Sequence, residues 1–171
     1  MELIFPTAEL ELAALEYRAS HFEFGEKEIH GDAGFDIAES YTAWLNKLKD
    51  NLNIKEGDFV PSTTYFGVKN GKIVGIIDIR HRLNDSLKKV GGHIGYSIKP
   101  SERGKGYATQ MLSLALDKCR EIGVSKALLT CNKSNIASAK VIMNNAGVLE
   151  DEFTDEEGNV VQRYWITLIK D

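Results

Sequence analysis

The spacing of apolar residues separates helical from extended stretches along the chain. In residues 36–52, apolar side chains recur every three or four positions, as on the buried face of a helix. Runs rich in β-branched and aromatic residues indicate strands instead, and Asn70-Gly71 between two of them is a typical hairpin turn. The pattern predicts strands over residues 3–5, 63–68, 73–81, 93–99, 127–131, 148–153 and 160–169. It predicts helices over residues 8–20, 36–52, 108–123 and 135–145, with loops over 22–35, 82–92 and 155–159.

The order of these elements indicates an α/β fold, in which a mixed sheet carries helices on its faces. No internal repeat, low-complexity segment or linker divides the 171 residues, so we expect a single domain over residues 1–171. A hydrophobic share of 43% and a charged share of 27% are ordinary for a globular protein with one well-buried core.

The sequence contains nothing that indicates a membrane or an oxidising compartment. The longest apolar stretches, such as residues 73–77, are far shorter than the roughly 20 residues that span a bilayer. The N-terminus is acidic and lacks the basic, then apolar, order of a signal peptide. Cys119 and Cys131 have no nearby Cys or His partner, so we expect buried thiols rather than a disulfide or a metal site. These features predict a cytoplasmic protein with no membrane partner.

Charge is distributed unevenly along the chain. The formal net charge of −4 disfavours nucleic acid as a partner. Residues 1–60 carry 13 acidic against 5 basic side chains, a net −8, whereas residues 61–171 carry 12 against 16, a net +4. A basic C-terminal part suits an anionic cofactor and an acidic N-terminal part suits a cationic substrate, although a solvated surface explains the same counts.

The most informative stretch runs from a predicted strand through a glycine-rich turn into a helix. Gly104 and Gly106 allow the backbone to approach a phosphate closely at the helix N-terminus, while Arg103 and Lys105 add positive charge. A nucleotide P-loop needs Ser or Thr after the Lys, and a dinucleotide loop needs a small residue where this chain has Thr109. Neither nucleotide motif fits, and a tight glycine turn before a helix is the structural alternative.

The sequence Arg103-Gly104-Lys105-Gly106-Tyr107-Ala108 resembles the R/Q-x-x-G-x-G/A motif of the GNAT acetyltransferases. The resemblance implies that this loop holds the pyrophosphate of coenzyme A (CoA). The preceding strand, up to Ile98, is similar to the family's central strand, whose splayed end holds the pantetheine and the thioester. Asn135, with Ser138 three residues later, resembles the start of the family helix that contacts the pantetheine.

The resemblance extends over almost the whole chain and has consequences for fold and function. It implies a mixed, mostly antiparallel sheet with helices on both faces and a splayed central strand. It also implies an N-acetyltransferase that moves an acetyl group from acetyl-CoA, its co-substrate, to a primary amine of a small molecule, peptide or protein, without a metal. A homodimer is common in the family.

One position departs from the family pattern. Many members carry a tyrosine seven residues after the helix-start Asn, as the acid that protonates the leaving thiolate, but this chain has Ile142 there. Tyr164, Tyr96 and Tyr65 are the other phenols available for this role. The departure also motivates an alternative function, an acyl-CoA-binding regulatory module without turnover.

Acetyl transfer requires a base, because an amine with a pKa of about 10.4 is less than roughly 0.1% neutral at pH 7. No nucleophile constellation is evident, so we expect the amine to attack the thioester directly, with strand N–H groups stabilising the oxyanion. His93, His81 and the glutamates of the early loop are the alternative bases. The expected acceptor-site residues are Glu23, Tyr65, Arg82 and Asn84. A structured or solvated loop is the alternative explanation for these polar residues. The same explanation applies to the other polar residues of the early loop, Glu26, Glu28, His30 and Asp32.

Overall fold

The computed structural model describes residues 1–55, 57 and 59–168, and it confirms the predicted α/β fold. Four strands form an antiparallel sheet in the order β1-β2-β3-β4, and three form a second sheet in the order β5-β7-β6. Their bounds are β1 (Glu2–Ile4), β2 (Ser62–Lys69), β3 (Lys72–Arg80), β4 (Ile94–Ile98), β5 (Lys126–Asn132), β6 (Val148–Thr154) and β7 (Val160–Thr167). The last residue of the predicted final strand, Ile169, lies outside the described residues.

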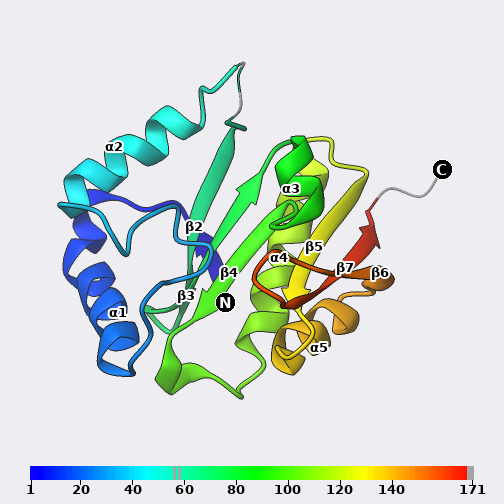
Figure 1. Cartoon of the computed structure of the whole chain (residues 1–171). Coiled ribbons are helices and arrows are strands. Elements are labelled where there is room, and N and C mark those ends of the chain that lie inside the picture. Colours follow the sequence, from blue (N-terminus) through cyan, green and yellow to red (C-terminus); the bar gives the residue numbers. More distant parts are fainter. Residues whose placement is uncertain (56, 58, 169–171) are drawn as a thin grey trace.

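Helices cover both faces of the first sheet (Figure 1). Their bounds are η1 (Ala8–Leu10, 3₁₀), α1 (Glu11–Glu23), α2 (Tyr41–Asn51), α3 (Asp85–Lys89), η2 (Pro100–Glu102, 3₁₀), α4 (Tyr107–Glu121) and α5 (Ile136–Asn144). On one face, α1 and α2 pack over Phe66 and Ile76. On the other face, α4 covers Ile77 and Ile79, and α5 packs beside α4 and against β5. The alternation of buried side chains along β3 therefore gives the molecule two cores.

The second helix is shorter than the apolar pattern predicts. It begins at Tyr41 rather than near residue 36, because the Ser40 side chain accepts a hydrogen bond from the Ala43 N–H and so caps the helix N-terminus. Ile37 was expected on the buried face, but it precedes the helix and is 84% exposed. Leu12 of α1 is also exposed, since Ala14, Tyr17 and His21 form that helix's buried face.

A short helix, α3, forms inside the segment predicted as a polar loop. The Asn84 side chain accepts a hydrogen bond from the Leu87 N–H and caps this helix. Five residues are too few for an apolar period to show, so the cap was its only signal in the sequence. Arg163 of β7 donates a hydrogen bond of 2.8 Å to the Lys88 carbonyl, which ties α3 to the hairpin of β6 and β7.

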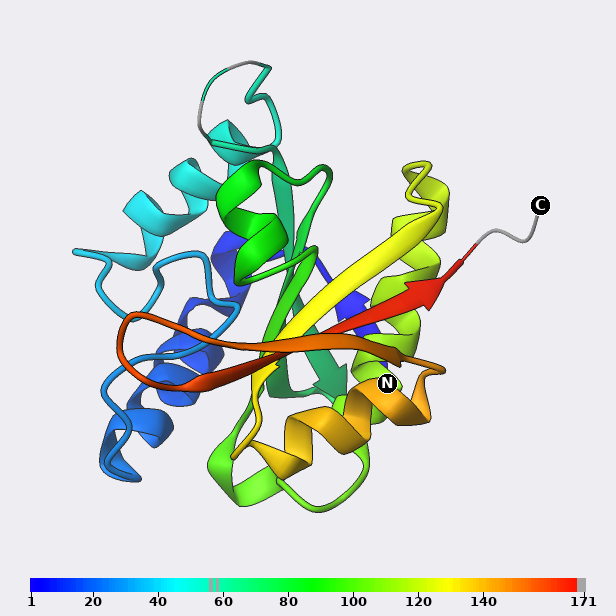
Figure 2. The ribbon, with the colours of Figure 1, turned by 45° about the vertical axis from the view of Figure 1, so that its right-hand side comes forward.

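The two sheets meet at β4 and β5 and then separate. Both strands lead to the end of the molecule where the glycine loop and α5 begin (Figures 1 and 2). Within the described part of the chain, one isolated bridge joins them, between Gly92 and Leu129. Next to it, the His93 N–H donates to the Leu128 carbonyl at 2.7 Å. Beyond this point β4 and β5 belong to different sheets, which agrees with the expected splayed central strand.

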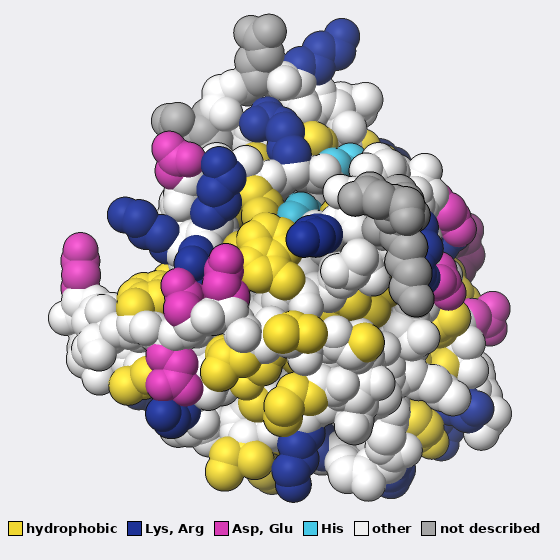
Figure 3. Space-filling model, turned by 90° about the vertical axis from the view of Figure 1, so that its right-hand side faces the viewer, with side chains coloured by type: hydrophobic (Ala, Val, Ile, Leu, Met, Phe, Trp, Pro, Cys, Tyr) yellow, Lys and Arg dark blue, Asp and Glu magenta, His cyan; other side chains and the backbone are white. Residues whose placement is uncertain are grey.

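The outer surface mixes charge with apolar side chains. Figure 3 shows hydrophobic side chains across the middle of the face on the β7 side, with Lys and Arg gathered at the upper left. The exposed apolar residues of α5 and β6 are Ile136, Met143, Val148 and Leu149. Among the helices of the described residues, none is long and apolar enough to cross a bilayer.

Candidate functional site

The glycine loop connects η2 to the N-terminus of α4. Gly104 and Gly106 adopt φ values of +75° and +78°, which glycine tolerates and L side chains rarely adopt. A Cβ added at either residue would meet no atom within 4 Å, so the space above both glycines is open. Gly106 is the N-cap residue of α4, and no side chain caps this end. The first-turn N–H groups of a helix lack intrahelical partners, so this end can bind an anion.

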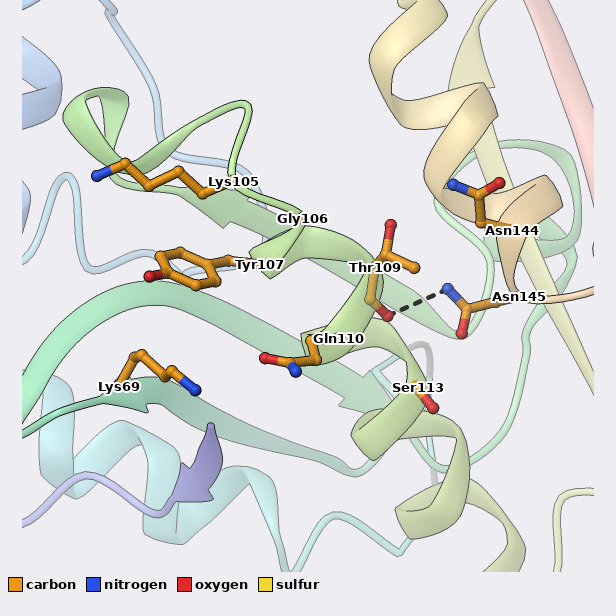
Figure 4. Close-up of a pocket in the computed structure, with 9 residues that line it drawn as sticks. All are labelled: Lys69, Lys105, Gly106, Tyr107, Thr109, Gln110, Ser113, Asn144 and Asn145. Carbon is orange, nitrogen blue, oxygen red and sulfur yellow. Dashed lines mark hydrogen bonds between the residues drawn. The ribbon is translucent and has the colours of Figure 1, made fainter.

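A groove of about 550 Å³ opens beside this helix end. Figure 4 shows Lys69, Tyr107 and Gln110 on one side of the α4 N-terminus and Asn144 and Asn145 on the other. The Asn145 side chain donates a hydrogen bond of 3.2 Å to the Thr109 carbonyl and so fixes α5 to α4. Lys69 is the last residue of β2, and no pattern in the sequence indicated that it would lie beside the glycine loop.

Arg103 is already engaged by protein groups. Its Nε donates to the Ile98 carbonyl at 3.1 Å, and its Nη2 lies 2.7 Å from Glu26 Oε1. Its guanidinium carbon also lies 5.4 Å from the centroid of the Phe24 ring, within the range of a cation–π contact. Glu26 in turn contacts His21 Nδ1 through its other oxygen, at 2.5 Å. Arg103 therefore connects the glycine loop to the segment after α1, a role that the sequence did not indicate.

The register of β4 directs half of its backbone groups into the gap beside β5. The Arg80 N–H donates to the His93 carbonyl, and the Lys99 N–H donates to the Val74 carbonyl, so odd-numbered residues of this stretch pair with β3. The N–H and C=O groups of Ile94, Tyr96 and Ile98 consequently point toward β5. Because the two strands diverge, these groups line the gap that leads inward from the glycine loop.

Two hydroxyl groups meet where β4 faces the start of α5. The Tyr96 hydroxyl lies 2.9 Å from Ser138 Oγ, and the Ser138 N–H donates to the Asn135 side chain at 3.1 Å, which caps α5. Burial raises the pKa of Tyr96 to about 12 and also raises the pKa of the Cys131 thiol, which contacts Ser138. Both cysteines are buried and unlinked, as expected. Ile142 is fully buried in the core.

Tyr164 belongs to a separate chain of hydrogen bonds. Its hydroxyl donates to Gln162 Oε1 at 2.8 Å, and Gln162 Nε2 donates to Glu152 Oε1 at 2.7 Å. Burial raises the pKa of this phenol, and Cys131 lies close enough to contribute to the shift. Tyr164 and Tyr96 therefore both lie near Cys131, and the Tyr164 proton is donated to an amide oxygen.

His93 is a buried residue with a backbone partner. Its Nδ1 accepts a hydrogen bond of 2.9 Å from the Leu128 N–H, so the ring proton of the neutral form lies on Nε2. Burial, and then the charge of Arg80, lower the pKa of His93 to about 4. Arg80 was not among the candidate residues, and it donates to the Gly91 and Gly92 carbonyls at 3.1 and 3.0 Å. To act as a base, His93 Nδ1 would first have to leave the backbone.

The residues after β3 hold neighbouring loops. His81 Nε2 lies 2.8 Å from the Thr63 hydroxyl, and burial lowers the pKa of this histidine. Arg82 donates to the carbonyls of Lys55 and Phe59, at 3.5 and 3.3 Å. Asn84 caps α3. The structure thus gives each of these three residues a loop contact, and it places them after the C-terminal end of β3, whereas β4 leads to the glycine loop from the residues paired with the start of β3.

The remaining candidates lie in different places. Glu23 ends α1 and lines a second groove of about 570 Å³, between α1 and η2. Tyr65 lies beside Lys118 and Glu121, at the opposite end of α4 from the glycine loop, so the structure does not bring it together with the other site residues. In the loop after α1, Gly31 packs directly on the Gly95 carbonyl of β4, which brings this loop to one side of the gap.

Several acidic residues of this loop have structural partners. Asp32 accepts hydrogen bonds from the Gly34 and Asp36 N–H groups, and burial raises its pKa to about 6. Glu26 is held by Arg103 and His21, whereas Glu28 and His30 are exposed and 3.8 Å apart. Among the described residues, no group of three His, Cys, Asp or Glu side chains is arranged to hold a metal ion.

Comparison with known proteins identifies the fold. Residues 12–147 match the family model for the acetyltransferase (GNAT) domain. No curated protein sequence matches the chain significantly. Similar solved structures include RimL, a ribosomal L7/L12 alpha-N-protein acetyltransferase in complex with coenzyme A, with a TM-score of 0.71 and 16% identity over 97% of this chain and 93% of that one.

Two further structures share the fold. The microcin C7 self-immunity acetyltransferase MccE, in complex with acetyl-CoA and AMP, has a TM-score of 0.70 and 18% identity, over 96% of this chain and 91% of that one. A chimera of spermidine N-acetyltransferase SpeG from Vibrio cholerae and hSSAT has a TM-score of 0.66 and 17% identity, over 98% and 96% of the two chains.

Proposed function

Because the chain belongs to the GNAT acetyltransferase family, we propose that it transfers the acetyl group of acetyl-CoA to a primary amine, which attacks the thioester directly. The observation that carries this proposal is the open glycine loop at the uncapped start of α4, at the end of the molecule where β4 and β5 have separated into different sheets. RimL in complex with CoA and MccE in complex with acetyl-CoA share this fold.

The residues of the glycine loop fit the phosphates of CoA. Open space lies above Gly104 and Gly106, and the uncapped α4 N-terminus provides N–H donors together with the positive end of a helix dipole. Lys105 and Lys69 add positive charge beside the groove. Arg103 supports binding indirectly in this proposal, since its hydrogen bond to the Ile98 carbonyl fixes the mouth of the gap.

Acetyl-CoA supplies the acetyl group as a thioester, and the protein groups of the gap would orient and stabilise it. The N–H groups of Ile94, Tyr96 and Ile98 are directed into the gap by the register of β4. One of them would donate to the carbonyl oxygen as negative charge develops there during attack. Ile142 suggested a binding module without turnover, but its burial in the core is compatible with a proton donor on another element.

The acceptor amine would approach past the loop after α1. This loop packs on β4 through Gly31, and its exposed Glu28 offers negative charge to an amine that is protonated in solution. Part of the acidic excess of the N-terminal part is neutralised internally, because Glu16 pairs with Lys99 and Glu26 pairs with Arg103. We propose a cationic acceptor, such as a polyamine or a peptide with a free amino group.

Release of the CoA thiol from acetyl-CoA tests this function. A panel of acceptors should include spermidine, a monoamine, a peptide with a free N-terminus, and acidic and neutral amino compounds. We expect thiol release with at least one amine, and the fastest release with a cationic one. If neutral or anionic acceptors react best, the proposed acceptor class is wrong. Absence of both CoA binding and thiol release would contradict the function itself.

A substitution in the glycine loop provides the matched comparison. Gly106→Val places a branched side chain at φ +78° beneath the expected phosphates and should abolish CoA binding, measured by calorimetry, in a protein that still folds. Gly123→Val is the control, because Gly123 has φ +84° and open space at the other end of α4. Both changes strain the backbone, but only Gly106→Val should affect the affinity for CoA. Equal CoA affinity in the two variants would show that the loop does not bind phosphate.

A further inference from the structure

Glu26 lies shortly after the end of α1, and its two carboxylate oxygens have different partners. Oε2 lies 2.5 Å from Nδ1 of His21 in α1, and Oε1 lies 2.7 Å from Nη2 of Arg103, the first residue of the glycine loop. The Glu26 backbone N–H also donates to the His21 carbonyl at 3.1 Å. One residue thus connects the loop after α1, which would form the acceptor side, to the loop that would hold the phosphates of CoA.

His21 fixes the orientation of this carboxylate. Its ring is fully buried, and its Nε2 has no hydrogen-bond partner among the described residues. Burial lowers the pKa of His21, and an ionised carboxylate only accepts, so the neutral ring donates its Nδ1 proton to Glu26. The ring packs edge-on against Tyr17, with 4.7 Å between centroids, and the Tyr17 hydroxyl lies 3.0 Å from Ser97 Oγ on β4. A clamped imidazole therefore holds one oxygen of Glu26 and leaves the other for Arg103.

Arg103 connects the carboxylate to the backbone that would bind phosphate. It directly precedes Gly104, and its Nε donates to the Ile98 carbonyl at 3.1 Å. Glycine has more backbone freedom to lose than other residues, so a phosphate bound at Gly104 and Gly106 would order the loop and the Arg103 that begins it. An ordered Arg103 loses less entropy when it pairs with Glu26. Phosphate at the glycine loop should therefore stabilise the docked position of the loop after α1.

We propose that Glu26 is a positioning residue, and that its ion pair with Arg103 couples CoA binding to the order of the loop after α1. Phosphates at the glycine loop and an amine beside the loop after α1 then each strengthen the binding of the other, because such coupling is reciprocal. Glu26 acts through Arg103 and needs no contact with either substrate. The inference rests on the proposed acetyl transfer for the role of the loop as the acceptor side.

Hydrogen exchange with a fragment of CoA tests the coupling. The fragment is 3′-phosphoadenosine 5′-diphosphate, which carries the phosphates of CoA but has no pantetheine that could touch the loop after α1 directly. At saturation it should slow amide exchange in residues 103–110 and also, by about threefold or more, in residues 26–36. Glu26→Ala and Arg103→Ala should each abolish the effect on residues 26–36, and the double variant should match the single ones.

Glu16→Ala is the matched control. Glu16 also joins α1 to the chain after β4, through an ion pair of 2.8 Å with Lys99. This pair lies before η2 rather than at the glycine loop. Its removal should leave the protection of both segments at the wild-type level.

Glu26→Gln separates coupling from simple loss of the loop. Its amide oxygen can still accept from His21, so exchange in residues 26–36 without ligand should stay near the wild-type rate, whereas the charge that faces Arg103 is gone. We expect this variant to lose most of the transmitted protection. Reciprocally, the amine that reacts fastest in the acceptor panel should tighten CoA binding about fivefold or more in wild type but not in Glu26→Gln, as measured by calorimetry.

The outcomes distinguish this inference from the proposed function. Wild-type protein in which the fragment protects residues 103–110 alone overturns the inference, as does a Glu26→Gln variant that keeps full protection of both segments. Equal CoA affinity with and without the amine in wild type also overturns it. Transmitted protection in a protein that acetylates no amine contradicts only the proposed function, and absence of any binding of the fragment and of CoA contradicts both.

Discussion

At the scale of single residues, His93 forms two hydrogen bonds to β5 at the point where β4 and β5 diverge and regular pairing between them ends. Its backbone N–H donates to Leu128, and its Nδ1 accepts from the Leu128 N–H, so the side chain completes a pair of hydrogen bonds at the point of separation. A buried N–H without an acceptor costs about 1–3 kcal/mol, which gives this position a structural reason to carry a ring nitrogen or an amide oxygen.

The pH dependence of stability tests this role of His93. The pKa of His93 is about 4 in the folded protein and near 6.5 in an unfolded chain. As pH falls from 6.5 toward 4, the unfolded state takes up a proton that the folded state does not, so the free energy of unfolding decreases. His93→Gln removes this contribution and keeps an acceptor for Leu128. We therefore expect wild type to lose more stability than the variant across this range.

Urea unfolding at a series of pH values provides the measurement. The raised pKa of Asp32, about 6, acts in the opposite direction between pH 3.8 and 6, but it is common to both proteins and cancels in the comparison. Parallel curves of unfolding free energy against pH for the two proteins would contradict the expectation.

The same variant also tests His93 as the catalytic base. If His93 is the base, His93→Gln should lower kcat by about 10²–10⁴-fold and abolish the acidic limb of the pH–rate profile. Because His93 Nδ1 is bonded to the backbone, we expect neither change.

The glycine loop could be predicted at this scale, but the long-range side-chain contacts of the candidate site could not. A turn with two glycines before a helix is a local pattern, visible in six consecutive letters of sequence. The contact between Tyr96 and Ser138, by contrast, joins residues 42 positions apart, and it depends on how far β4 and β5 diverge. Arg103 shows the same limit, because its partner Glu26 comes from a loop whose course cannot be read from periodicity.

At the scale of elements, the loop after α1 is docked by backbone contact. Gly31 has φ +73°, and a Cβ there would lie 2.2 Å from the Gly95 carbonyl oxygen of β4. Gly31→Ala should therefore lower the free energy of unfolding by about 3 kcal/mol or detach the loop, because strain and steric overlap add. Gly25→Ala, at φ +95° with open space around it, should cost only about 1 kcal/mol.

Thermal unfolding and steady-state kinetics distinguish the two variants. If the loop forms the acceptor side, Gly31→Ala should raise the KM for the amine more than the KM for acetyl-CoA, while Gly25→Ala leaves both nearly unchanged. Equal stability of the two variants would show that the contact between Gly31 and Gly95 is easily relaxed.

Element boundaries were the least predictable part of the fold. Ser40 and Asn84 set the starts of two helices through side-chain caps, which the spacing of apolar residues does not reveal.

At the scale of the whole molecule, the two sheets leave a gap that a ligand can fill. The backbone groups of Ile94, Tyr96 and Ile98 face this gap, and one bridge joins β4 to β5 within the described residues. We expect CoA to slow amide hydrogen exchange in peptides covering residues 94–98 and 103–110. Peptides from α2, on the opposite face of the first sheet, serve as the internal control. Protection spread evenly over both regions would argue against binding in the gap.

The contact between Gly31 and Gly95 also bears on how such a protein can acquire new substrates. Two backbones in direct contact place no demand on the identity of the neighbouring side chains, and Lys27, Glu28 and His30 are all exposed. Mutations at these three positions can accumulate without shifting β4, on which the acetyl group would be held. Acceptor preference can therefore drift under selection while the acetyl-donor half of the site is inherited unchanged.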